Sequence, residues 1–171
     1  FTDFAKEAQR EIFADPSSPL FHVDNTFVRR ESLPRMERKL LTYDASRMGK
    51  TVVGEDCVSL LPAITVENIN LCDIRDILTH RVFSVLYYGL PMKREGDVEG
   101  YRYSLAKNSL DLMTVLLVSY GVLESGFMRR LELIKTLAID ERTKAYFAYC
   151  LSIKLSTERE DMFTIEEMEE Q

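Results

Sequence analysis

The sequence predicts a mainly α protein, an up-and-down helical bundle that follows a short α/β segment made of a helix and one or two strands. Three observations predict this class. Apolar residues recur at helical spacing over most of the chain after residue 58. An alternation typical of a strand occurs earlier, at Leu20–Val28. Hydrophobic residues make up 46% of the chain, which supports a buried core and argues against disorder.

The first 57 residues form the predicted α/β segment. A short helix that Asp3 or Thr2 can cap ends at the loop Asp15–Pro19, which is dense in helix-breaking residues. Leu20–Val28 alternates as a strand does, and Thr51–Gly54 is a second, very short extended piece. Asp24 lies inside the first strand, where aspartate is disfavoured, so it either faces solvent at a sheet edge or has a function.

Residues 58–171 form the predicted bundle, which ends in an acidic, exposed helix. Its first long helix stops at Gly89-Leu90-Pro91, and a charged, mobile linker, Met92–Gly100, follows. The helix Tyr103–Gly121 is apolar on most of its surface and is therefore central. Its narrow polar stripe, which either faces water or lines a cleft, consists of Ser104, Lys107, Asn108, Asp111 and Thr114. The other predicted helices are Ser32–Leu40, Val66–Tyr88, Gly126–Leu137 and Glu141–Leu155.

Composition and motifs exclude several functional classes. No apolar run reaches the ~18 residues of a membrane span, and the three cysteines form no CxxC pair, which favours a reduced, cytoplasmic protein. The sequence contains no GxGxxG, P-loop, HExxH or nucleophile-elbow motif. The net charge of −6 reflects the acidic tail. Residues 29–50 are locally basic and either steer a phosphate-bearing ligand or form an ordinary solvated surface.

One short pattern indicates a nuclease. Arg75 and His80 form an R-x4-H motif that resembles the motif of HEPN-domain ribonucleases, which are helical dimers. The resemblance implies a homodimer in which the guanidinium stabilises a pentavalent phosphate while the imidazole moves a proton. Side chains five residues apart diverge by roughly 140° around a helix, so a cleft or a partner must bring them together. Alternatively, Asp76 and His80 are an i,i+4 pair and Arg75 is a flanking charge.

A longer series of features resembles nucleotidyltransferase-domain proteins of the DNA polymerase beta superfamily, specifically those with a helical domain after the catalytic one. The order of the pieces, over residues 20–135, carries this resemblance. The resemblance implies that residues 1–57 are the C-terminal part of an α/β nucleotidyltransferase domain and that residues 58–171 form the other wall of its cleft. The pieces are Val23-Asp24-Asn25, Leu41–Asp44, Thr51–Asp56, Leu61-Pro62, Ile77–Arg81 (ILTHR), Tyr103–Leu112 (YSLAKNSLDL), Gly121 and Arg129-Arg130.

The same resemblance implies a reaction and the residues that take part in it. Asp24 corresponds to the third of three carboxylates that bind Mg²⁺, with which the intact protein would move a nucleotide from an NTP to a hydroxyl acceptor. Lys107 would meet the triphosphate, and Asp111 would orient the acceptor. The first carboxylate pair is expected before Phe1, in a missing N-terminal part of the same protein. From spacing alone, an exposed i,i+4 ion pair explains Lys107 and Asp111, and the bundle is then a non-catalytic partner-binding module.

Overall fold

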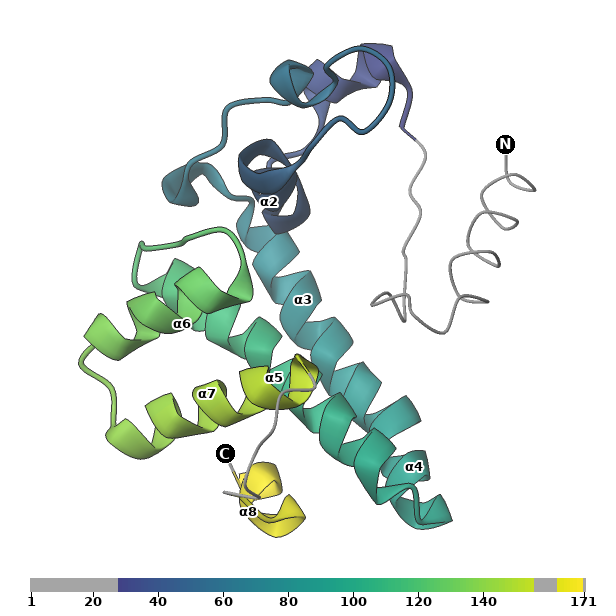
Figure 1. The fold of residues 1–171 in the computed structure, drawn as a ribbon, viewed down its shortest axis with the longest axis vertical. Helices are drawn as coiled ribbons and strands as arrows, with labels where there is room; N and C mark the ends of the chain where they lie inside the picture. The colour runs from purple at the N-terminus through teal and green to yellow at the C-terminus, as the bar shows by residue number, and fades with distance from the viewer. Residues whose placement is uncertain (1–27, 156–162, 171) are drawn as a thin grey trace. The chain divides into compact units, whose positions relative to one another are not determined.

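The computed structural model describes residues 28–155 and 163–170 of the chain (Figure 1). The chain divides into two compact units, Phe1–Leu33 and Pro34–Gln171. Asp24 lies outside the described residues, as does the predicted first strand except for Val28. The predicted strand Leu20–Val28 therefore stays a prediction.

The described residues of Pro34–Gln171 fold as a helical bundle, which confirms the mainly α prediction. They contain no strand, and the predicted extended piece Thr51–Gly54 is an irregular loop that turns at Gly54 with φ +88°. No helix among them is long and apolar enough to cross a membrane. The helices are α2 (Leu40–Met48), α3 (Leu71–Ser84), α4 (Leu90–Glu95), α5 (Val98–Ser119), α6 (Phe127–Thr136), α7 (Glu141–Lys154) and α8 (Ile165–Glu170), with short helical turns η1 (Arg30–Arg35), η2 (Val58–Leu60), η3 (Val66–Asn68) and η4 (Val85–Gly89).

α5 is the central helix, as its sequence predicts. It contacts α3, α4, α6, α7 and α8, and Figure 1 shows it running through the middle of the bundle. Leu110, Met113 and Leu117 on its apolar face are fully buried. Gly121 follows the helix with φ +70°, a left-handed conformation that glycine adopts without strain and that ends the helix. Leu112, which the sequence places on the apolar side, is 43% exposed, so part of this side lies uncovered.

The helical rod before α5 does not stop at Gly89-Leu90-Pro91, and that prediction is wrong. α3 continues through η4, a π-helical turn, into α4. In η4 the N–H of Leu90 donates to the carbonyl of Val85, five residues back. The wider turn accommodates Pro91, which has no N–H to donate and whose ring would crowd the carbonyl four residues earlier in a regular α-helix.

α3, η4 and α4 together pack against α5 as an antiparallel hairpin. The connection is only Gly96-Asp97, much shorter than the predicted linker Met92–Gly100. Gly96 takes φ +82°, and the Asp97 side chain accepts from the N–H of Gly100 to cap α5. Gly89 is buried, and a Cβ there would lie 3.1 Å from the ring of Tyr101, so this glycine lets the two arms approach closely.

The start of α2 shows how a tertiary contact overrides a local signal. The sequence predicts a helix over Ser32–Leu40, but η1 ends at Arg35 and α2 begins only at Leu40. The N–H of Leu40 donates to the Asp73 carboxylate of α3 at 2.8 Å. A carboxylate at this position satisfies one of the free amides of a helix start and complements its positive end. Asp73 therefore determines where α2 begins.

The last helices cover α5 from the other side. α6 and α7 lie close to their predicted bounds, and the Asp140 carboxylate caps α7 by accepting from the N–H of Thr143 at 2.8 Å, as predicted. The acidic tail differs from its prediction because α8 is not wholly exposed. Met168 is buried, and the Glu169 carboxylate accepts from the Tyr101 hydroxyl of α5 at 2.7 Å.

Candidate functional site

A largely buried carboxylate on α5 is surrounded by cations from three other helices and its own. Nε of Arg81 on α3 lies 2.8 Å from Oδ2 of Asp111, and the two side chains are only 22% and 21% exposed. The Nε–H of Arg81 makes no hydrogen bond of good geometry within the described residues. The contact is therefore chiefly Coulombic, between two charges that are both poorly hydrated.

The pKa shifts of this region have burial as their first cause. Burial raises the pKa of Asp111, and four cations oppose the rise, in decreasing order Arg81, Lys154, Lys107 and Arg130. Burial also lowers the pKa of Lys154, Asp111 opposes this, and the other three cations lower the pKa further. Both shifts therefore have the same main origin, the burial of a charged group where water is scarce.

Arg130 is the one of these cations that is fully compensated. Its side chain is 3% exposed, and Nη2 contacts both carboxylate oxygens of Asp44 at 2.6 and 2.7 Å. Its Nε donates to the carbonyl of Glu124 at 2.9 Å, and its Nη1 lies 3.3 Å from the hydroxyl of Thr114. Arg130 thus joins α6 to α2 and α5, and its charge is used in the fold.

The three remaining cations share a single carboxylate, Asp111, which pairs with Arg81. Neither Lys107 nor Lys154 has a carboxylate partner in the part of the chain that the structure describes. The ammonium of Lys154 lies 4.0 Å from the ring centroid of Phe127, a cation–π contact that holds it in place. We call Arg81, Lys107 and Lys154 the cation cluster. With Asp111 as the single carboxylate among them, the cluster has an excess of two positive charges.

The structure brings together two of the residues predicted from the sequence. Lys107 and Asp111 both belong to this region, but they do not form the i,i+4 ion pair that their spacing allows, because Asp111 pairs with Arg81. Lys107 is exposed, whereas Asp111 is largely buried beside α3. The polar stripe of α5 thus does not face water throughout, and one of its members, Asn108, lines two cavities. Asp24, the predicted metal ligand, lies outside the described residues.

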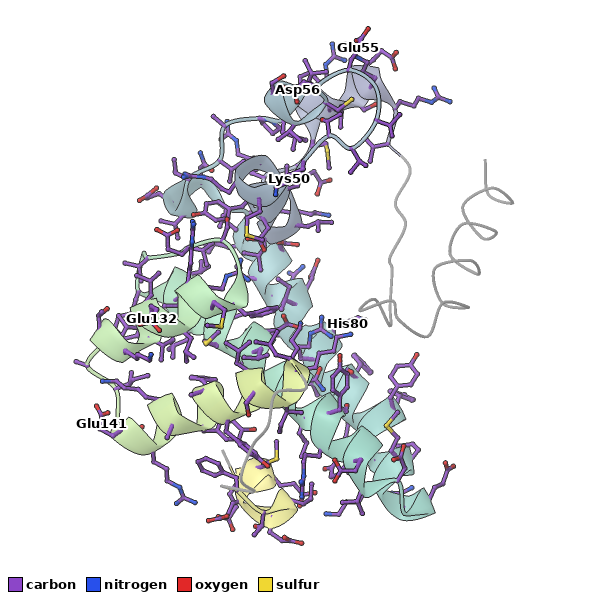
Figure 2. All side chains as sticks on the ribbon, viewed as in Figure 1. Lys50, Glu55, Asp56, His80, Glu132 and Glu141 are labelled. Atoms are coloured by element: carbon purple, nitrogen blue, oxygen red, sulfur yellow. The ribbon has the colours of Figure 1, made fainter. Side chains whose placement is uncertain are left out.

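Arg75 and His80 are both exposed on α3, where Figure 2 labels His80. The guanidinium of Arg75 contacts Oδ1 of its neighbour Asp76 at 3.0 Å, with both side chains about two-thirds exposed or more. This pairing uses the aspartate that the sequence also offers to His80. No element of the described residues is shown to bring Arg75 and His80 to a common point, and the dimeric nuclease stays a hypothesis.

Sequence reasoning missed Arg81 and Lys154 as members of the site. Arg81 is the last residue of the ILTHR piece, so the resemblance included this arginine but assigned it no function. Lys154 ends an apolar helix and belongs to no motif, and only the packing of α7 on α5 places it near Asp111. The described residues contain no group of three or more His, Cys, Asp or Glu side chains that could hold a metal ion.

Comparison with known proteins identifies no family for the chain. No protein-family model matches it, and neither the curated proteins nor the solved structures give a significant match.

Proposed function

We propose that this chain forms the helical wall of a nucleotidyl-transfer site and that its cation cluster binds the triphosphate of a nucleoside triphosphate. The observation that supports the proposal is the excess of two positive charges around Asp111, held by three helices. Poorly hydrated cations attract an anion more strongly than solvated ones because the effective dielectric constant is lower. A polyphosphate is a small biological anion with enough charge to compensate several cations at once.

Each residue of the site has a role in this proposal. Lys107 is exposed and reaches the ligand first, whereas Lys154 is held on Phe127 and gains a counter-charge when the anion binds. Arg81 exchanges Asp111 for phosphate oxygens, which guanidinium binds in a fork-like geometry. Asp111, with its raised pKa, is released to accept a hydrogen bond from the acceptor hydroxyl.

In this proposal, Asp24 and other residues outside the described part would hold the metal. Such a metal, if bound, would supply compensation for the negative charge of the phosphate groups. The described carboxylates do not fit a metal site by themselves, since none of their groupings has enough ligands. The contribution of this helical wall is therefore charge complementarity and orientation, and both are testable without the metal.

Calorimetric titration with inorganic tripolyphosphate and with MgATP tests the proposal. We expect Lys107→Ala and Lys154→Ala each to weaken binding of both probes by about tenfold, the loss of one charge-assisted contact. Lys135→Ala is the matched control, because this lysine pairs with Glu132 on the outer side of α6 and removes the same charge. Equal effects of all three variants would contradict the proposal, since a local site would then be indistinguishable from net charge.

A further inference from the structure

Two adjacent cavities lie along α5, and Arg81 of the cation cluster lines one of them. One, of about 460 Å³, lies among η4, α5, α7 and α8, and Leu105, Tyr146 and Phe147 contribute to its walls. The other, of about 470 Å³, lies between α3 and α5 and is walled by apolar side chains such as Leu78 and Val82. Volumes of this size are those of small-molecule sites.

The two cavities share three wall residues, Val85, Asn108 and Leu112. We call the combined hollow the Asn108 groove. Val85 is the first residue of η4, the π-helical turn, and such turns occur frequently at functional sites because the inserted residue widens the helix locally. The irregular part of the α3–α4 rod therefore lies at the point where the two cavities meet.

Asn108 is the unusual member of this wall. It is 4% exposed, and its Oδ1 accepts no hydrogen bond from any described residue. Its Nδ2 has one weak contact, with the hydroxyl of Ser104 at 3.5 Å. Buried side-chain amides are nearly always hydrogen-bonded, so an unpaired acceptor beside a cavity is a position at which a bound ligand would donate a hydrogen bond. Neighbouring polar residues do not supply it, since Ser109 uses its hydroxyl on Tyr146 and on the carbonyl of Leu105.

We propose that the Asn108 groove binds a small, neutral, mostly apolar molecule that donates one N–H or O–H hydrogen bond to Oδ1 of Asn108. The apolar walls take the body of the ligand, and the amide oxygen fixes its orientation. Leu112 is 43% exposed and lines both cavities, and binding requires its side chain to turn so that the donor reaches the buried oxygen. Arg81 lines the cavity between α3 and α5 and is paired with Asp111, and a neutral ligand leaves this ion pair intact.

Indole and benzofuran test this proposal with the full chain. They have nearly the same size and shape, but indole carries an N–H donor and benzofuran carries a weak acceptor. We expect indole to bind about tenfold more tightly in ligand-observed NMR or calorimetric titration, the difference that one buried hydrogen bond makes. Asn108→Leu is nearly isosteric and removes the acceptor, so indole should lose its advantage while benzofuran binds as before.

A second variant keeps the test independent of the folding of Asn108→Leu. Leu112→Trp retains Asn108 and fills the groove from its partly exposed side, so it should abolish binding of both probes. Far-ultraviolet circular dichroism of each variant reports whether the bundle is intact. Equal binding of indole and benzofuran to the unmodified chain, tighter binding of benzofuran, or binding of neither probe would overturn the proposal.

Discussion

The buried pair of Arg130 and Asp44 makes the strongest prediction about stability. Asp44→Ala removes both oxygens that Nη2 of Arg130 contacts, at 2.6 and 2.7 Å. The guanidinium stays in place because its Nε and Nη1 still donate to Glu124 and Thr114. With a side chain only 3% exposed, Arg130 then keeps a poorly hydrated charge that has lost its carboxylate partner.

The expected loss follows from the burial of the two partners. Breaking a buried ion pair by removing one partner costs roughly 3–5 kcal/mol in free energy of unfolding. Asp44 is 28% exposed, so water reaches the vacated space and partly solvates Arg130. The lower end of the range, about 3 kcal/mol, is therefore expected. Urea unfolding followed by circular dichroism measures it, and with a slope of about 2 kcal/mol per molar the midpoint falls by about 1.5 M.

Two further variants decide whether the uncompensated charge is the cause. Arg130→Met in the Asp44→Ala background removes the buried charge and should recover much of the lost stability. Glu37→Ala removes an ion pair with Lys39 whose side chains are 68% and 47% exposed, and it should cost less than about 0.5 kcal/mol. A loss below about 1 kcal/mol for Asp44→Ala, or no recovery in the double variant, would refute the reasoning.

Three more predictions concern a turn and two titrating groups. Gly126→Ala should cost about 2 kcal/mol in urea unfolding, because φ is +85° and a Cβ would lie 3.1 Å from a methionine sulfur. Gly121→Ala is the control, with φ +70° and open space around the position, and it should cost about 1 kcal/mol. The hydrogen bond from Lys93 lowers the pKa of Glu169 from 4.5. The contribution of this carboxylate to stability is therefore present above pH 4.5 and is lost as the pH falls through the lowered pKa. In that pH range, the melting temperature of Glu169→Gln should depend less on pH than that of the unmodified chain. Burial lowers the pKa of Lys154 from 10.5. Bound tripolyphosphate should raise that pKa, so binding at alkaline pH should be accompanied by proton uptake at Lys154. Calorimetry in buffers of different ionisation enthalpy measures this uptake, which should be absent in Lys154→Gln.

Local signals predicted the helices whose ends are determined locally. Asp140 caps α7, and Gly121 ends α5 where their residue types predict. The stop at Gly89-Leu90-Pro91 failed because the π-helical turn absorbs the proline, and this turn depends on packing against α5. Local sequence could not predict the start of α2 at Leu40 either, since the carboxylate that caps it, Asp73, is 33 residues away.

The candidate site shows the same division between local and distant information. Helical spacing places Lys107, Asn108 and Asp111 on one side of α5, and this is what the sequence could predict. It could not predict which neighbour covers each residue. Arg81 makes Asp111 a buried partner, and Lys107 stays exposed. Asn108 is buried beside two cavities, one between α3 and α5 and the other among η4, α5, α7 and α8.

The two proposed sites are neighbours on α5, which determines how they can be separated by experiment. Asn108 and Asp111 are three residues apart, so their side chains lie about one helical turn apart along the same side of the helix. Arg81 both pairs with Asp111 and lies at the edge of the groove, so its replacement disturbs both sites and distinguishes nothing. Lys154 and Asn108 each belong to one site alone. A variant of Lys154 should leave indole binding intact, and a variant of Asn108 should leave tripolyphosphate binding intact, because neither residue contributes to the other ligand.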